Sequence, residues 1–441
     1  MSDLPKGWVT ARLDELLAPE PAAITDGPFG SNLKTEHYQD SGPRVIRLQN
    51  IGDGDFRDER AHISVERFQA LGKHEARAGD IIVAALGETL PRACLVPPGL
   101  GPAIVKADCI RVRLHPEMDA RFVSAMLNSP PVRKDATAQI SGVGRPRLNL
   151  AKIRSIRLPV PPVKEQERIV AAIQVQLSRL DTAEQLLGRV RRRSAQMRAA
   201  VLAQAVEADW PVRPLGELLV SVRNGIFVSR PAPGPPGVPI FRISAVRPLQ
   251  LDLSDIRYAP ISLSEAHSYL LNAGDLLFTR YSGNPAYVGA CAVVPAHVTT
   301  VIHPDKLIRG VVDRSLVMPE FVAIAINVGE GRRQIDERLK TTAGQVGIAG
   351  GQLKTVEIPI PPLKEQERLV AKVEHSLTIL DALATATDHA LLRSDHLRHS
   401  ILERAFSGQL VPQDSGDEPA FELLARIASD DRKTAKPRRR Q

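Results

Sequence analysis

The feature that most constrains this chain is an eight-residue phrase that occurs twice. Residues 161–168 read Pro-Pro-Val-Lys-Glu-Gln-Glu-Arg, and residues 361–368 repeat the phrase 200 positions later with a single Val-to-Leu change. The offset stays constant beyond the phrase, since the pair at 180–181 and the pair at 380–381 are both Leu-Asp. A constant offset over about forty residues indicates a segment without insertions, which is typical of long helices and not of loops. We therefore predict two copies of a unit made of one domain and one long helix.

The repeat divides the chain into five parts. We predict a first domain at 1–160, a central helix at 161–208, a second domain at 209–360, a distal helix at 361–410, and a partly disordered, basic tail at 411–441. The only two tryptophans, Trp8 and Trp210, open the two copies. We expect each of them to anchor the edge of its domain core.

Strand-like runs also recur inside the two domains. The runs at 44–48 and 78–83 correspond to those at 239–243 and 273–278, and both pairs have an offset of 195. The runs at 78–83 and 273–278 both begin with an Ala-Gly-Asp turn, in which we expect a positive φ at glycine. Short apolar strands beside long helices predict an α+β chain with two mixed α/β domains.

The two long segments have the pattern of paired helices. Proline is well suited to a first helical turn, and the glutamates that follow favour the positive end of the helix dipole. Apolar and small residues then recur at alternating steps of three and four, which is typical of a coiled coil. The predicted seam consists of Ile169, Ile173, Gln176, Leu180, Ala183, Leu187, Val190, Ser194, Met197 and Val201, with Leu369, Val373, Ser376, Leu380, Leu383, Thr387, Ala390, Ser394, Leu397 and Ile401 on the second helix. Connectivity requires the helices to run antiparallel, with a domain at each end and a pseudo-twofold axis between them.

Charge and composition favour a polyanionic partner only weakly. The net charge of the 441 residues is +8, but six of the basic residues lie at 432–440, and without them the chain is close to neutral. Any nucleic-acid surface must therefore be local. The N-terminus has no apolar signal stretch, no run is long enough to span a membrane, and the three cysteines have no metal spacing. We expect a cytoplasmic protein with free thiols and no membrane partner.

Two domains alternating with two such helices resemble the specificity subunit of a Type I restriction-modification system. The resemblance covers nearly the whole chain, and its most specific part is the junction from a strand through Pro-Pro to Glu-Gln-Glu-Arg. Phrases typical of the family also occur at 26–34, at 280–284 and at 405–410, whereas the loop at 86–92 matches its counterpart in the second domain poorly.

The resemblance implies a non-catalytic DNA-recognition subunit. Each globular part would be a target-recognition domain that reads one half of a split site in double-stranded DNA, while the helices set the spacing and dock two DNA methyltransferase subunits. Restriction subunits would join where the system also cleaves DNA. Because the helices share their sequence and the domain loops do not, we expect an asymmetric bipartite site. We expect no cofactor on this chain, with S-adenosylmethionine on the methylation subunit.

Catalytic motifs are weak or missing in the sequence. Residues 284–287, Asn-Pro-Ala-Tyr, approach the Asn-Pro-Pro-Tyr motif of amino-methyltransferases but lack its second proline, and no glycine-rich cofactor pocket precedes them. There is no phosphate-binding loop and no His or Cys cluster with metal spacing. We expect no catalytic and no metal residues.

Candidate DNA-binding residues follow from chemistry, since arginine and lysine reach base edges and phosphates, and tyrosine stacks or donates to phosphate. The candidates are Lys34, Arg47, Arg92, Arg145 and Arg147 in the first domain, and Arg223, Arg242, Arg280, Tyr281 and Tyr287 in the second. Each could instead be a solvated surface charge or part of an ion pair at a strand edge. Two other functions stay open at this point: a structural scaffold whose end domains bind proteins, and an enzyme with an unfamiliar site.

Overall fold

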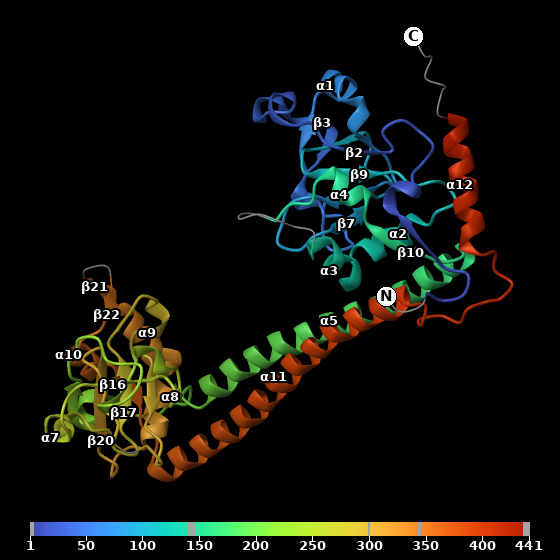
Figure 1. Cartoon of the computed structure of the whole chain (residues 1–441). Helices are drawn as coiled ribbons and strands as arrows, with labels where there is room; N and C mark the ends of the chain where they lie inside the picture. The colour runs from blue at the N-terminus through green and yellow to red at the C-terminus, as the bar shows by residue number, and fades with distance from the viewer. Residues whose placement is uncertain (1–3, 139–145, 299, 343–344, 435–441) are drawn as a thin grey trace. The chain divides into compact units, whose positions relative to one another are not determined.

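The structure is a computed structural model that describes residues 4–138, 146–298, 300–342 and 345–434. It divides into two compact units, the first formed by Met1–Leu186 with Ala390–Gln441 and the second by Leu187–His389. Each unit mixes helices with small, mainly antiparallel sheets, and helices α5 (Val163–Gln204) and α11 (Leu363–Phe406) pack together (Figure 1). The predicted fold class, two mixed α/β domains with a pair of long antiparallel helices, is confirmed.

The first unit is built on two four-stranded sheets. The central sheet has the order β2-β9-β6-β7, with strands Ile24–Asp26, Cys109–Val112, Ile81–Ala84 and Arg92–Leu95. The other has the order β4-β3-β8-β5, with strands His62–Ile63, Tyr38–Ile46, Ala103–Val105 and Glu75–Ala76. Strand β6 is buried on both faces: Ile81 and Val83 enter one core cluster while Ile82 and Ala84 enter another. The unit also contains β1 (Val9–Arg12), β10 (Arg157–Val160), α1 (Val65–Ala70), α2 (Ala120–Leu127), α3 (Pro130–Ala138) and α4 (Leu150–Arg154).

The second unit repeats the central sheet of the first. Its order is β12-β20-β17-β19, with strands Leu219–Asn224, Leu307–Val312, Leu276–Thr279 and Cys291–Val293. The two Ala-Gly-Asp turns precede β6 and β17, and Gly79 and Gly274 have φ values of 89° and 83°, as predicted. The remaining elements are the strands β11 (Val212–Pro214), β13 (Val238–Phe241), β14 (Val246–Arg247), β15 (Gln250–Leu251), β16 (Ile256–Ala259), β18 (Tyr281–Ser282), β21 (Lys340–Thr342), β22 (Gln345–Gly347) and β23 (Glu357–Pro359), and the helices α6 (Leu215–Leu218), α7 (Leu263–Ala266), α8 (Pro319–Asn327), α9 (Gly329–Glu337) and α10 (Gly350–Lys354).

The glutamine of the repeated phrase has the same structural role in both units. Gln166 is fully buried, donates from Nε2 to the Pro161 carbonyl and accepts from the Asp119 amide just before α2. Gln366 does the same with the Pro361 carbonyl and the Met318 amide before α8. The phrase therefore joins the start of each long helix to a helix of the domain that precedes it.

Replacing Gln366 by Leu should destabilise the second unit. The substitution leaves the Met318 amide and the Pro361 carbonyl buried without their partner, which costs about 1–3 kcal/mol for each group. Denaturant unfolding of the purified chain would measure the loss, with Glu367→Leu as a control because Glu367 is exposed on the next position of the same helix. An equal midpoint for the two variants would contradict this role of Gln366.

The helix pair is antiparallel in each unit. In the first unit Arg398 of α11 pairs with Asp181 of α5 at 2.5 Å, and Ser394, earlier on α11, donates to Glu184, later on α5. In the second unit Arg198 pairs with Asp381, and Arg191 lies 4.0 Å from Asp388. In both units, later positions on one helix meet earlier positions on the other.

The predicted seam is wrong at every second step in the middle of the helices. Leu380, Thr387 and Ser394 are buried as predicted, but Val190, Met197, Leu383 and Leu397 are exposed. The next residue faces the partner helix at several of these points, including Glu184, Arg198 and Arg398, which form the contacts between the helices. The less exposed positions of α11 include 380, 384, 387, 391, 394 and 398, which still alternate steps of four and three, so the heptad holds and only its phase differs from the predicted one.

The two tryptophans differ in their surroundings. Trp8 belongs to the first core and donates from Nε1 to Glu165 at 3.0 Å. Trp210 is only half-buried and lies outside the core, so the prediction is wrong for this residue. In the first unit Arg168 pairs with Asp417, whereas in the second the equivalent Arg368 pairs with Glu365, the counterpart of Glu165.

An additional helix, α12 (Ala420–Thr434), lies in the segment that the sequence suggested to be a partly disordered tail. Ala420, Leu423 and Ile427 enter the first core, and Arg426 pairs with Glu117 at 2.7 Å. The basic residues after 434 lie outside the described part of the chain.

The remaining general features concern cysteines, metals and membranes. Cys94, Cys109 and Cys291 are free and buried, and burial raises the pKa of Cys94 to about 12. Over the described ranges, no group of three or more His, Cys, Asp or Glu side chains is placed to hold a metal ion. In the same ranges no helix combines the length and the apolar character needed to cross a membrane.

Candidate nucleic-acid interface

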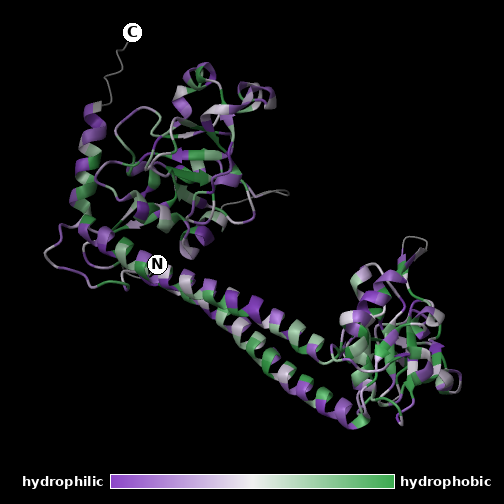
Figure 2. Cartoon of the chain, turned by 180° about the vertical axis from the view of Figure 1, so that it is seen from behind, coloured by the Kyte–Doolittle hydropathy of each residue, from purple (hydrophilic) through white to green (hydrophobic). Residues whose placement is uncertain are grey.

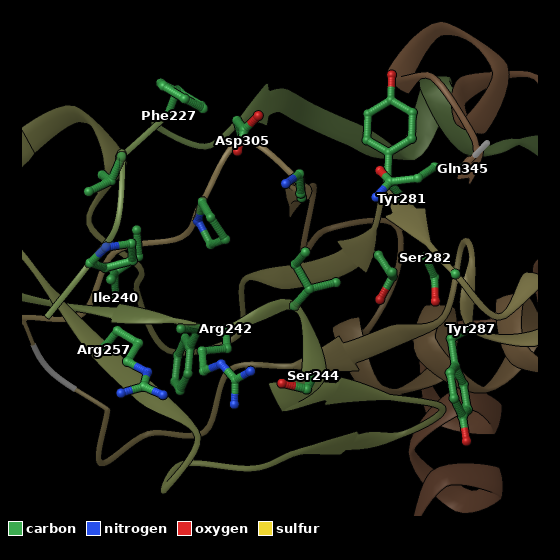
Figure 3. A pocket seen from close by; sticks show the side chains of 18 of the residues that line it. Phe227, Ile240, Arg242, Ser244, Arg257, Tyr281, Ser282, Tyr287, Asp305 and Gln345 are labelled. Carbon is green, nitrogen blue, oxygen red and sulfur yellow. The ribbon is translucent and has the colours of Figure 1, made fainter. Parts of the chain in front are cut away.

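The second unit contains an open cavity of about 440 Å³ beside the ends of its strands, which we call the second-domain cavity. Its lining comes from the connection between β12 and β13, from β13 and β16, from the β17–β19 connection and from the segment before β20 (Figure 3). The residues are Phe227, Val228, Pro231, Ile240, Phe241, Arg242, Ile243, Ser244, Arg247, Arg257, Thr279, Tyr281, Ser282, Gly283, Tyr287, Pro304, Asp305, Lys306 and Gln345. Three of the sequence candidates, Arg242, Tyr281 and Tyr287, are among them.

Four cationic side chains line this cavity. Arg242 pairs with Asp255 at 3.0 Å, whereas Arg247, Arg257 and Lys306 have no ion pair with any described residue. Strand pairing places Arg257 of β16 opposite Ile240 of β13, and Figure 3 shows its guanidinium on the same side of the cavity as that of Arg242. Since Asp305 is the only carboxylate of the lining, the cavity carries a net positive charge that suits phosphate groups.

Cation–π contacts hold the two tyrosines of the cavity. The guanidinium of Arg280 lies 4.8 Å from the ring centre of Tyr281, and that of Arg247 lies 4.4 Å from the ring centre of Tyr287. Tyr281 packs on Gly347 of the paired strand β22, where an added Cβ would lie 2.3 Å from the tyrosine ring. Any larger residue at 347 would therefore displace Tyr281.

Arg280 itself is held beside the cavity rather than in its lining. Its Nη1 donates to the Asp305 carbonyl at 3.3 Å, and its buried Nε has no partner among the described residues. The planar arginine and the tyrosine below it form a fixed pair of the kind that stacks on bases.

Arg223, the remaining candidate of the second domain, is placed elsewhere. Its guanidinium lies 4.5 Å from the ring centre of Tyr269 and donates to the Ser268 carbonyl, away from the cavity lining. His303, which packs against Tyr269, is fully buried, and burial lowers its pKa to about 4. This histidine is therefore neutral at physiological pH and adds no charge to the surface.

In the first unit, three of the candidates gather around the loop between β6 and β7. Arg47 precedes the short 3-10 helix Leu48–Asn50, as Arg242 precedes Ile243–Ala245 in the second unit. Arg92 donates to the Leu48 carbonyl at 3.3 Å, and Arg147 forms a backbone bridge with Leu86 in the β6–β7 loop. Arg147 also pairs with Asp108 at 2.7 Å.

The other two candidates of the first domain are not part of this group. Lys34 is exposed on the connection between β2 and β3 and lies 3.5 Å from Glu36. Arg145 falls outside the described residues.

Sequence reasoning missed three cations and one exposed aromatic residue of the second-domain cavity: Arg247, Arg257, Lys306 and Phe227. Arg247 and Arg257 lie in strands that only the tertiary structure brings together. A signal for Phe227 existed, because Gly27-Pro28-Phe29 and Gly225-Ile226-Phe227 occupy matching positions at an offset of 198.

Comparisons with known proteins show which proteins this chain is similar to. The profile of the Type I restriction modification DNA specificity domain matches residues 72–190. The EcoKI specificity subunit of Escherichia coli strain K12 is 28% identical over 97% of this chain and 96% of its own length. The StySPI specificity subunit of Salmonella potsdam is 24% identical over 94% and 92%, respectively.

Solved structures show the same fold. A chain from a study of the complex assembly and conformational transition of the type I R-M system has a TM-score of 0.71 at 21% identity, and the match covers 93% of this chain and 100% of that one. The HsdS subunit from Thermoanaerobacter tengcongensis has a TM-score of 0.57 at 21% identity, over 92% of this chain and 98% of the other. The repeated frame, the family profile and the relatives that match nearly the full length lead to one conclusion: the chain belongs to the family of Type I restriction-modification specificity subunits, the DNA-recognition components of these systems.

Proposed function

We propose that this chain catalyses no reaction itself and that each of its two domains reads one half of an asymmetric bipartite site in double-stranded DNA. The observation that carries the proposal is that the two domains share the strand order of their central sheet but differ in the loops that connect its strands. The sheets β2-β9-β6-β7 and β12-β20-β17-β19 have the same order, while the β6–β7 and β17–β19 connections differ in sequence. Two domains with the same central sheet but different polar loops are suited to bind two different half-sites.

The second-domain cavity supports DNA as the ligand. Its unpaired Arg257 and Lys306 suit phosphates, and the Arg280–Tyr281 pair offers a planar surface and donors for base edges. In the first domain, Arg47, Arg92 and Arg147 would take the corresponding places.

We further propose that the long helices set the spacing between half-sites and dock the methylation subunits. Large apolar side chains are exposed on both helices, namely Leu186, Val190 and Met197 on α5 and Ile379, Leu383, Leu392 and Leu397 on α11. Leu186 and Val190, like Ile379 and Leu383, are four residues apart and share a face of their helix, and an exposed apolar face suits a protein–protein contact. S-adenosylmethionine would bind to the methylation subunit and not to this chain.

The experiment that tests the proposal is methylome sequencing of cells that express the methylation subunit of the same system with or without this chain. We expect methylation at one asymmetric bipartite motif only when the chain is present. Calorimetry of the purified chain with S-adenosylmethionine should show no binding. Unchanged methylation without the chain, or a single uninterrupted motif, would contradict the proposal.

Replacing Arg257 by Ala should weaken binding to DNA that contains the second half-site by about 1–3 kcal/mol. Arg257 has no carboxylate partner among the described residues, so its removal leaves no buried charge behind. Binding of the assembled complex to duplexes at several salt concentrations would measure the effect. A uniform loss with a smaller salt slope would indicate a phosphate contact, and a loss confined to one base position would indicate base reading.

The matched control for this prediction is Arg213→Ala. Arg213 pairs with Glu217 near β11 and does not line the cavity. Equal losses for Arg257→Ala and Arg213→Ala would argue against a specific role of the cavity.

A further inference from the structure

Two exposed phenylalanines occupy equivalent positions in the two domains. Phe29 follows β2 and Phe227 follows β12, which are corresponding edge strands of the two central sheets. The two residues are 44% and 74% exposed. Single exposed apolar residues are common on protein surfaces, so exposure alone would mean little. Their equivalence in two domains with divergent loops requires a further reason.

The backbone before each phenylalanine is pinned in the same way. A Cβ added to Gly27 would lie 2.1 Å from the carbonyl carbon of Lys106, and one added to Gly225 would lie 2.1 Å from the carbonyl oxygen of His303. The glycine is thus required at both sites by the close approach of another backbone segment.

Hydrogen bonds strengthen this anchor in the second domain. The Ile226 amide donates to the His303 carbonyl at 3.1 Å, and the Asp305 amide donates back to the Ile226 carbonyl at 2.9 Å. The ring of Phe227 is therefore presented from a fixed segment, so little conformational entropy is lost when a ligand covers it.

Both rings have cationic side chains in their neighbourhood. The guanidinium of Arg147 lies 5.6 Å from the ring centre of Phe29. Phe227 lines the second-domain cavity together with Arg242, Arg257 and Lys306, and Figure 3 shows it at the rim of the cavity beside Asp305. An exposed aromatic ring beside cations is the combination that binds bases and backbone of nucleic acids. A purely apolar protein partner would desolvate Arg257 and Lys306, which have no ion pair with a described residue, without supplying a negative charge.

We infer that Phe29 and Phe227 each insert at one base step of the half-site that their domain reads, and partly unstack it. This inference rests on the proposed function. It adds an apolar contact that does not depend on hydrogen bonds to base edges. Apolar wedges of this kind open base steps while nearby cations hold the adjacent phosphates. Flexible pyrimidine–purine steps open most easily, so the wedge favours a half-site with such a step at that position.

The test uses the chain assembled with its methylation subunit and duplexes with 2-aminopurine at successive positions of each half-site, omitting the base that is methylated. We expect a fluorescence increase at one step in each half-site on binding. Phe227→Ala should abolish the signal in the second half-site only, and Phe29→Ala should abolish it in the first only. Each substitution should weaken DNA binding roughly five- to hundredfold.

Two variants provide matched controls. Phe421→Ala removes an exposed phenylalanine from α12, outside the recognition loops, and should leave both signals intact. Phe227→Trp keeps an aromatic wedge and should retain the signal in the second half-site. Because Phe29 and Phe227 are exposed, their replacement should not shift the unfolding midpoint.

Three results would overturn the inference. Signals that persist in Phe29→Ala and Phe227→Ala would show that the rings do not open base steps. Loss of the methylation subunit from these variants in the absence of DNA would assign the rings to a protein contact instead. If the unaltered complex bound no bipartite site at all, the proposed function itself would fail, and this failure is distinguishable because it precedes any substitution.

Discussion

Replacement of Asp275 by Ala is expected to destabilise the second domain by about 3–5 kcal/mol, which is the cost of removing one partner from a buried ion pair. The Asp275 side chain is 4% exposed and forms an ion pair with Arg309, whose Nε lies 2.6 Å from the carboxylate. Its other contact is the Asn272 amide at 2.6 Å, within the turn that precedes β17. Without the carboxylate, Arg309 stays charged in the sheet between β12 and β17 with no compensating partner.

Denaturant unfolding would measure this loss, and Asp255→Ala is the matched control. Asp255 also pairs with an arginine, Arg242, but that arginine is about half exposed, so its removal should cost less than about 1 kcal/mol. In the assembled complex, Asp275→Ala should weaken recognition of the second half-site while the first is still read. Similar losses for the two variants would mean that Asp275 adds nothing beyond a surface pair.

The repeated phrase predicted the course of the chain well because helices preserve register. An insertion in α5 or α11 would rotate every following side chain, so insertions are not tolerated there. The constant offset of 200 therefore indicated two long helices. The role of the glutamine inside the phrase could not be predicted. Its partners, the amides of Asp119 and Met318, lie 47 and 48 positions earlier in the sequence.

The seam was predicted less well because apolar character was taken as the sign of an inward position. Val190 and Met197 belong to the predicted seam, yet they are exposed, while Arg198 and Glu184 face the partner helix. A charged residue that bridges two helices carries no apolar signal. Long stems of arginine can cover apolar surface while the charged head stays solvated, which explains how they replace leucine here.

The candidate site was predictable in chemistry but not in detail. Tyr281 and Tyr287 were found because they sit in a recognisable loop. Arg257 and Lys306 were missed because they reach the cavity from strands and turns that only the fold brings together. Arg223 shows the opposite error. It was a candidate, but its guanidinium lies against the ring of Tyr269 and not in the cavity lining.

Exchange of residues 209–360 for the corresponding domain of another specificity subunit should replace the second half-site and leave the first unchanged. The domain enters and leaves through one small sheet, in which β11 pairs with β23 and Val212 lies opposite Pro359. The first domain has the same arrangement, with Val9 opposite Val160 in the β1–β10 pair. Cuts at these strands preserve the helix starts that follow.

The physical reason is that each domain has its own core. The main core cluster of the first unit contains no residue of 187–389, and that of the second unit contains no residue outside that range. The DNA-binding free energies of two domains without a shared core should add. Exchanging one domain should therefore leave the contribution of the other unchanged. Each base pair that no longer matches costs about 1–3 kcal/mol, and several mismatches together should abolish methylation at the original site.

A second exchange sharpens this prediction. If residues 209–360 are replaced by a copy of residues 1–160, both domains should read the same half-site on opposite strands, and the methylated motif should become a palindrome with an unchanged spacer. Methylome sequencing of cells that express each chimera with the methylation subunit would reveal the motifs. A chimera that changed both half-sites together, or that altered the spacer while α5 and α11 stayed intact, would refute independent reading by two domains, because the unexchanged domain and the helices keep their own sequence and their own packing.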